Sequence, residues 1–148
     1  MTAAIQASAG AVQAGDGCPA ARIVDLERAM LDMPQVEIPT MHDFAPGLYI
    51  RTIEIPAGTV LTGHVHTTEH IFIVSKGDLT IATEDGLRRV QAPFQMVCRP
   101  GLKRAGYAHT DVVCTNVHIT PETDLSKLEA LLIERPQLEA PRAQEVIE

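Results

Sequence analysis

The sequence lacks the features expected of a nucleic-acid-binding or membrane-spanning protein. Its 148 residues carry 12 Lys and Arg against 19 Asp and Glu, for a formal net charge of −7. Binding to a phosphate backbone needs a basic surface, so no nucleic-acid partner is expected. No run approaches the roughly 18 apolar residues of a membrane helix, and the first residues lack the basic start of a secretory signal. We therefore expect no membrane partner and a cytoplasmic location.

Cysteine and aromatic residues are also scarce. There are three cysteines, no Trp, two Tyr and three Phe. Cys18, Cys98 and Cys114 are an odd number at wide spacing, which favours neither a disulfide framework nor a CxxC site. Cys98 and Cys114 lie in apolar runs and are predicted to be small core residues. With 45% hydrophobic and 21% charged residues, the chain is typical of one globular domain.

The ends of the chain differ from its centre. Residues 1–18 are rich in Ala, Gly, Gln and Ser and are predicted to be a mobile tail, because they have little to bury. The domain is expected to span residues 19–135, followed by a tail at 136–148. Apolar spacing predicts a helix from Pro19 to just before Pro34 and a second from Thr120 to about Glu134. Their apolar faces are predicted to contain Ile23, Leu26, Met30 and Met33 in the first, and Leu125, Leu128 and Leu132 in the second.

Between these helices the sequence predicts a dense series of short strands. Turn residues such as Pro56-Ala57-Gly58 and Asp85-Gly86 separate them, and no helical segment connects them, so the strands should pair antiparallel in a barrel or sandwich. The predicted strands are LYIRTIEI, VLTGHVH, HIFIVS, LTIAT, LRRVQA, QMVC and VVCTNVHI.

Histidines are concentrated at one place, with His64, His66 and His70 within seven residues. On an extended strand, His64 and His66 would face the same way with their Cα atoms roughly 6.6 Å apart. Because ligand nitrogens lie about 2.1 Å from such a metal, His70 can join only if residues 67–69 reverse the chain. The pattern predicts a site for one divalent transition metal, and its alternative is a metal-free polar pocket.

These residues carry a family resemblance. Gly58, five residues, His64-Val65-His66, three residues, His70, six residues and Gly77 resemble the first motif of the cupin superfamily. The resemblance covers roughly residues 45–119 and implies an antiparallel cupin-type β-barrel, or jelly roll, with short flanking helices. The chain is also similar to short, uncharacterised cupin-like proteins of phages and prophages. Because cupin-like domains commonly pair, the resemblance further implies a homodimer.

The chain departs from the family pattern at two places. His70 stands where the family usually has glutamate, and Arg104 stands where the second motif has histidine. Since arginine cannot replace a neutral imidazole ligand, the family's fourth ligand is missing unless His109 or His118 supplies it. His42, which precedes the predicted barrel, is expected to be a loop residue.

The chemistry expected of this site follows from its charges. Three neutral imidazoles leave the full charge on a metal, which is expected to be Fe, Zn, Mn, Ni or Cu, with positions open for an oxygen-bearing ligand. Arg104 would hold a carboxylate or phosphate of a small anionic molecule. Tyr107 could donate a proton, and Glu69 could act as a base. Two hypotheses follow: a metal-dependent dioxygenase, isomerase or lyase, and a non-catalytic ligand-binding or phage-associated accessory protein.

Overall fold

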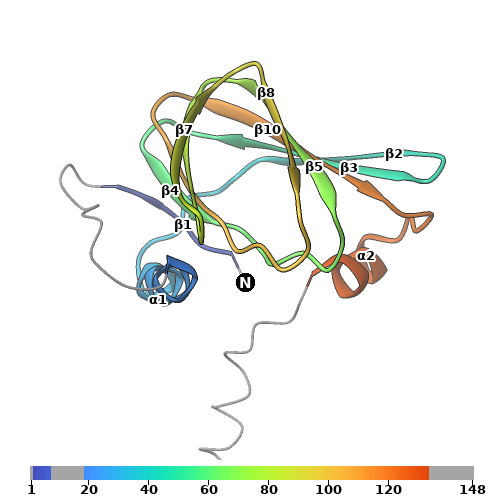
Figure 1. The fold of residues 1–148 in the computed structure, drawn as a ribbon, viewed down its shortest axis with the longest axis horizontal. Helices are drawn as coiled ribbons and strands as arrows, with labels where there is room; N and C mark the ends of the chain where they lie inside the picture. Colours follow the sequence, from blue (N-terminus) through green and yellow to red (C-terminus); the bar gives the residue numbers. More distant parts are fainter. Residues whose placement is uncertain (1, 8–18, 134–148) are drawn as a thin grey trace, which may run out of the picture.

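Two antiparallel sheets of five strands face each other in the computed structural model, which describes residues 2–7 and 19–133 (Figure 1). Sheet A has the strand order β1-β4-β9-β6-β7, and Sheet B has the order β2-β3-β10-β5-β8. The strands of Sheet A are β1 (Ala4–Gln6), β4 (Thr59–Thr62), β9 (Ala105–Ala108), β6 (Asp78–Thr83) and β7 (Gly86–Gln91). Those of Sheet B are β2 (Thr40–Ala45), β3 (Leu48–Ile55), β10 (Val112–Ile119), β5 (His70–Lys76) and β8 (Phe94–Cys98).

The core lies between the two sheets, because alternate side chains of each strand point inward. β3 and β10 pair over eight positions, and their buried residues face the opposite sheet. Cys98 and Cys114 are buried and free, which confirms the prediction of two core thiols. The main cluster joins Ile53, Ile55, Phe72, Val74, Val112 and Cys114 of Sheet B to Leu79, Ile81, Val90 and Ala108 of Sheet A.

The predicted all-β jelly roll is confirmed, and most of its strands lie where the apolar alternation placed them. β2 and β9 were not among the strands predicted from the sequence. All of β2 after Thr40 is exposed, since it is the edge strand of Sheet B, so it has no apolar alternation to read. β9 consists of Ala105, Gly106, Tyr107 and Ala108, in which only Tyr107 favours a strand, because Ala and Gly are depleted in strands.

Residues 2–7 differ from the expected mobile tail. Ala4–Gln6 form β1, which pairs antiparallel with β4 at the edge of Sheet A. Ala3 and Ile5 are buried against Met30 and Val60, so this short segment has apolar surface to bury after all. Cys18 and the predicted tail at 136–148 lie outside the described residues.

The first helix, α1 (Pro19–Leu31), covers the outer face of Sheet A. Ile23 and Met30 are buried as predicted, but Leu26 and Met33 are 39% and 47% exposed. Glu27 takes the place expected of Leu26, because Lys103 and a Thr62 hydroxyl satisfy its carboxylate beneath the helix.

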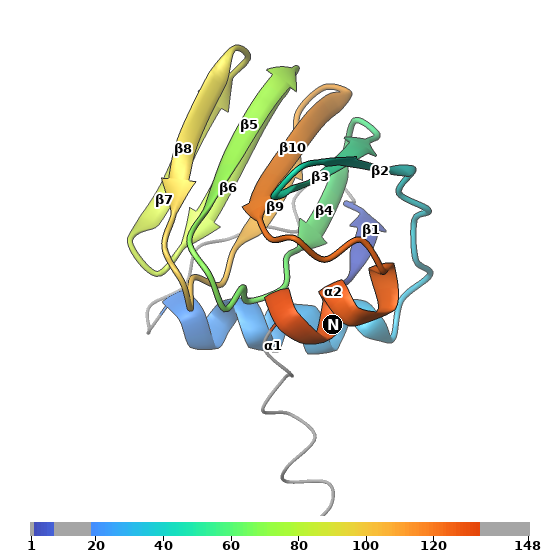
Figure 2. The same cartoon turned by 90° about the vertical axis from the view of Figure 1, so that its right-hand side faces the viewer.

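The second helix, α2 (Leu125–Leu132), lies across one end of the barrel, which we call the mouth (Figure 2). It begins later than predicted, because the Asp124 side chain rather than Thr120 caps it by accepting the Ser126 N–H. Leu128 and Leu132 are buried with Tyr49 of β3. No helix in the described ranges is long and apolar enough to span a membrane.

Candidate functional site

The centre of Sheet B brings a row of side chains to the mouth. β3 and β10 pair so that Tyr49 lies opposite His118. β10 and β5 pair with Val117 opposite Ile71, which places His118 opposite His70 at the next position. Tyr49, His118 and His70 are all buried, at 5%, 2% and 4% exposure, so the row faces the interior.

The loop of residues 63–69 adds a third imidazole to this row. The His66 carbonyl accepts the Gly101 N–H at 3.0 Å, and the Thr67 N–H donates to the Leu132 carbonyl at 2.9 Å. These bonds fix the loop against α2 and against the segment after β8. The chain reversal needed between His66 and His70 is therefore present.

Three imidazole rings meet at the mouth, and we call them the histidine triangle. The ring centroid of His66 lies 4.4 Å from that of His70 and 4.9 Å from that of His118. The centroids of His70 and His118 are 4.7 Å apart. The triangle joins two histidines of the predicted set to one that is 48 residues later in the sequence than His70 (118 − 70).

His64 lies outside the histidine triangle, although it lines the same cavity. β4 ends at Thr62, so the alternation expected to align His64 with His66 does not continue. Among the described residues, the ring contacts at the mouth join only the three triangle histidines and the aromatic residues beside them.

Burial keeps these imidazoles neutral. Desolvation, followed by the charges of neighbouring groups, lowers the pKa of His66 to about 2 and the pKa of His118 to about 4. Desolvation also lowers the pKa of His64 to about 4. It lowers the pKa of His70, and the positive charge of Arg104 adds to this effect. A neutral imidazole has a free lone pair, which is the form that ligates metals.

Three of the ring nitrogens have no protein partner. His64 Nδ1, His70 Nε2 and His118 Nδ1 are buried and make no hydrogen bond to the part of the chain that the structure describes. Buried polar atoms without a partner are rare and costly. Within residues 2–7 and 19–133, no group of three His, Cys, Asp or Glu side chains is already oriented as a metal site. The three triangle rings therefore lie close together, but their ring nitrogens do not point to a common position.

Arg104 points into the same cavity. Its guanidinium lies 4.6 Å from the centroid of the Phe72 ring and donates a long hydrogen bond of 3.5 Å to Asn116 Oδ1. Phe72 and Asn116 are opposite one another on β5 and β10, one inward-facing row from His70 and His118. The charge of Arg104 lowers the pKa of all three triangle histidines.

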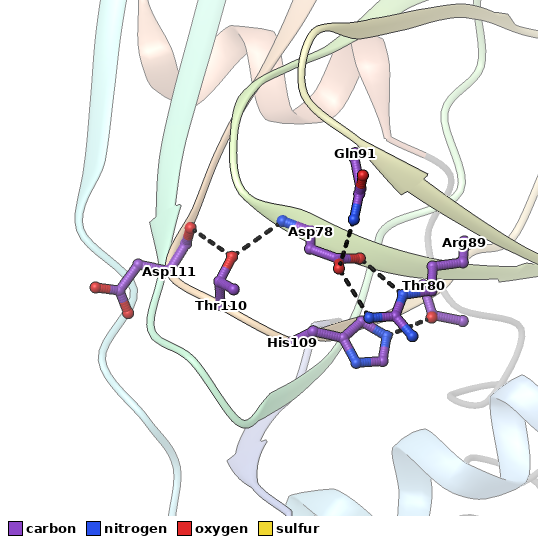
Figure 3. A network of polar contacts seen from close by, with 7 residues as sticks. All are labelled: Asp78, Thr80, Arg89, Gln91, His109, Thr110 and Asp111. Carbon is purple, nitrogen blue, oxygen red and sulfur yellow. Dashed lines mark hydrogen bonds and ion pairs between the residues drawn. The ribbon is translucent and has the colours of Figure 1, made fainter.

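The structure places His109, Tyr107 and Glu69 away from the triangle. Figure 3 shows His109 in a polar network of Sheet A, where its Nε2 lies 2.6 Å from Thr80 Oγ1. Tyr107 packs edge-on against His109 and contacts the apolar cluster beneath α1, which includes Met30. Glu69 is exposed in the loop before β5.

The interior encloses a cavity of about 650 Å³ that extends to the mouth. Its lining includes the imidazoles of His64, His66 and His118, the side chains of Arg51 and Arg104, and Asn116. Leu128 and Leu132 of α2 close it at the mouth, and Ile53 and Ile55 of β3 line its far part. The only acidic residue in the described lining is Glu129, which is exposed on α2.

His42 and Tyr49 lie near the triangle but were not among the predicted site residues. His42, expected in a loop, is on β2, and its Nδ1 lies 2.7 Å from the Tyr49 hydroxyl. The Tyr49 ring stacks on His118, with centroids 5.9 Å apart, and burial raises the pKa of the phenol. Alternation along LYIRTIEI gives Tyr49 and Arg51 the same face as the core residues Ile53 and Ile55, which was the available signal.

Comparison with known proteins identifies the fold. No protein-family model matches the chain, and no curated protein sequence matches it. KdgF from Halomonas sp. superposes with a TM-score of 0.51 at 19% identity, over 62% of this chain and 88% of that one. A cupin superfamily protein from Desulfitobacterium hafniense superposes with a TM-score of 0.50 at 7% identity, over 62% and 85% of the two chains.

An acetylacetone dioxygenase from Acinetobacter johnsonii has a TM-score of 0.48 at 15% identity, and the match covers 55% of this chain. The chain spans 59% of the length of that dioxygenase. Likeness at these identities concerns the fold and leaves the resemblance to phage proteins as an expectation. The two facing antiparallel sheets and the solved structures that match them show that this chain has the cupin fold.

Proposed function

We propose that the chain is a metal-binding cupin-fold protein that holds one divalent transition metal with His66, His70 and His118. The observation that carries this proposal is the convergence of three neutral rings with centroids 4.4 to 4.9 Å apart. With metal–nitrogen distances of about 2.1 Å, three rings around one ion have centroids roughly 4.5 to 5.3 Å apart. The triangle has the size that an ion requires.

The donor chemistry also fits a metal. His70 Nε2 and His118 Nδ1 lack protein partners among the described residues, as does His64 Nδ1 outside the triangle, and an ion held by the triangle would satisfy the first two. Imidazole rings turn about their side-chain bonds, so small rotations can bring the nitrogens of gathered rings to one point. Neutral imidazole ligands suit Fe, Zn, Mn, Ni and Cu, and the site makes no choice among them.

A bound metal would supply a Lewis acid with positions open to an oxygen-bearing molecule. The chain's own residues surround that position with complementary groups. Arg104 offers a guanidinium for an anionic group of a small ligand, and Asn116 orients it. Leu128 and Leu132 of α2 exclude water from the mouth. A dioxygenase, isomerase or lyase reaction is compatible with this arrangement.

A metal-content experiment tests the proposed centre and its ligand set. The purified protein should contain about one equivalent of a transition metal, or take one up on reconstitution. His66→Ala, His70→Ala and His118→Ala should each weaken binding by at least about a hundredfold, since even changes around a ligand cost about 10- to 100-fold. His64→Ala and His109→Ala serve as controls and should retain the metal. Elemental analysis and Co²⁺ titration followed by visible absorption provide the readouts.

Two results would contradict this ligand set. The first is a protein that neither contains nor takes up any of these metals. The second is loss of the metal from His64→Ala while His118→Ala keeps it, which would favour the set read from the sequence motif over the triangle. Circular dichroism of every variant separates loss of a ligand from loss of the fold.

A non-catalytic ligand-binding role is the second candidate, and one observation favours it. Glu69 and Tyr107, the expected acid–base residues, lie outside the cavity, and its described lining has only Glu129 as a carboxylate. On this hypothesis, whether or not the protein is associated with a phage, the cavity binds its ligand without turnover. Substrate consumption that disappears in folded His66→Ala would exclude this candidate.

A further inference from the structure

We infer that the cavity binds a small amphipathic carboxylate whose charged end lies against Arg51 and Arg104 and whose apolar chain fills the inner part of the barrel. The inference rests on the proposed function only in treating the cavity as a ligand site. It adds the class of ligand. Three observations support it. They are the positive charges in the cavity, the row of Sheet B at which these charges lie, and the mostly apolar side chains farther from the mouth.

Two guanidinium groups face the cavity without a carboxylate partner. Arg51 and Arg104 both line it, and neither forms an ion pair within residues 2–7 and 19–133. Both charges act on the same stretch of β10. Burial raises the pKa of Cys114 and lowers that of His118, and the two arginine charges oppose the first shift and add to the second. The described cavity lining therefore has a surplus of positive charge inside a protein with a net charge of −7, which favours an anionic ligand.

The register of Sheet B places the two arginines at one depth. Arg51 lies opposite Asn116, and Asn116 lies opposite Phe72. The Arg104 guanidinium stacks over that Phe72 ring and hydrogen-bonds Asn116. One row nearer the mouth come His118 and His70. An oxyanion in this row would therefore accept hydrogen bonds from both guanidinium groups and from the Asn116 amide, directly beneath the histidine triangle.

Beyond this row the cavity lining is mostly apolar, with Thr40 opposite Ile53 as a polar side chain. Arg51 and Ile55 are four residues apart on β3, which is about 13 Å of strand. Side chains that line this inner part come from both sheets, namely Ile53, Ile55, Leu61, Leu79, Ile81 and Cys114. Such a surface cannot solvate a second charged group, so it favours a ligand with one charged end and one apolar end.

A planar carboxylate suits a guanidinium better than other small anions of similar charge, because it can accept two parallel N–H bonds from one arginine. The probes are therefore chosen with a constant six-carbon chain and a variable head group. Hexanoate, 1-hexanol, hexylammonium and hexyl phosphate should be titrated into the full-length protein by isothermal titration calorimetry. Hexanoate should bind at least about tenfold more tightly than each of the others, as expected for charge-assisted hydrogen bonds.

Arginine variants test where the carboxylate lies. Arg51→Met and Arg104→Met keep the side-chain length but lose the guanidinium. Each should weaken hexanoate binding by at least about tenfold and leave 1-hexanol unchanged. Arg88 is the matched control, because its guanidinium also stacks on a phenyl ring, that of Phe94, but it is exposed and outside the cavity lining. Arg88→Met should bind hexanoate like the unmodified protein.

Equal affinities for hexanoate and 1-hexanol in the unmodified protein would overturn the inference, and this arm needs no variant to fold. Tighter binding of hexyl phosphate would overturn the choice of a carboxylate. The titrations should be repeated after EDTA treatment and in His118→Ala. Arginine-dependent hexanoate binding by a protein that takes up no metal on reconstitution would refute the metal centre alone. A metal-loaded protein without such binding would refute this inference alone.

Discussion

At the scale of residues, burial decides the chemistry of the cavity histidines. His118 is 2% exposed with Arg51 and Arg104 close by, and His70 is 4% exposed with Arg104 close by. Each of these surroundings disfavours a protonated ring. The metal-free site is therefore a set of neutral bases that only acid can charge, which has a measurable effect on folding.

The free energy of unfolding of the metal-free protein should fall as the pH decreases from about 6.5 toward 4. Folding lowers the pKa of His118 to about 4 and that of His66 to about 2, whereas an unfolded histidine titrates near 6.5. The unfolded chain therefore gains protons first, and stability that is fully present above about pH 6.5 is lost below it. Each such histidine adds a slope of about 1.4 kcal/mol per pH unit in that window.

Urea unfolding in EDTA at about pH 7, 6 and 5 measures this slope. His118→Gln, which removes one titrating ring, should have a shallower slope than the unmodified protein. A free energy of unfolding that stays constant between neutral pH and about pH 5 would refute the prediction.

The sequence identified part of this site and could not identify the rest. His66 and His70 are separated by four positions and could be paired by local spacing alone. His118 could not, because its place beside His70 depends on the register of β10 against β5, which only the folded sheet fixes. His64 was included because regular alternation was assumed through a segment that is a loop in the structure.

At the scale of elements, a buried ion pair connects α1 to the barrel. Lys103 Nζ lies 3.0 and 2.9 Å from the two carboxylate oxygens of Glu27 and 2.7 Å from the Gly63 carbonyl. Thr62 donates its hydroxyl to the same carboxylate at 2.6 Å. Because both charged side chains are almost fully buried, the charge of each offsets the desolvation cost of the other.

Removing one member of this pair should destabilise the protein far more than removing both. Lys103→Met leaves the Glu27 charge buried, and a loss of about 3–5 kcal/mol in unfolding free energy is expected. The double variant Glu27→Leu with Lys103→Met should recover most of that loss. Denaturant unfolding measures the cycle. Arg28→Met, which breaks an exposed pair with Asp25 on the same helix, is the control and should change little. Additive single effects would refute the coupling.

The same pair shows why the apolar face of α1 was read incompletely. Spacing alone assigned Leu26 to the buried face, since a leucine is a better core residue than a glutamate. The structure buries Glu27 because Lys103, which is 76 residues away, supplies its counter-charge. Strands with regular alternation such as β3 and β10 were predictable, whereas a buried polar contact between distant segments was not.

At the scale of the whole molecule, the two sheets have different outer faces. α1 covers the outside of Sheet A, but neither described helix lies across the outside of Sheet B (Figures 1 and 2). Near the mouth end of this uncovered face lies an apolar band, in which Ile50, Val117, Ile71 and Val97 lie side by side across β3, β10, β5 and β8, with Ile119 two residues beyond Val117. Ile71, Val97 and Ile119 are 43%, 59% and 80% exposed. An exposed apolar surface of this kind favours association.

The protein should form a homodimer through this apolar band. A second copy is the favoured partner because the band is uncharged, whereas other surfaces of two chains with a net charge of −7 would repel each other. Light scattering should give twice the 16.0 kDa mass of one chain, and Val97→Glu should give a monomer. Leu87→Glu, at an exposed site on Sheet A, is the control and should remain dimeric. A monomer of unmodified protein at micromolar concentration would refute the dimer.

The attachment of α2 links the entrance of the cavity to the proposed metal centre. Thr67 donates its N–H to the carbonyl of Leu132 and its hydroxyl to the carbonyl of Leu131, and the residue before it is His66. A guest molecule that displaces the helix must break these two bonds and free the backbone that carries one of the three rings. Entry of a ligand and retention of the metal would then compete. The protein would bind the metal most tightly while α2 remains attached across the mouth.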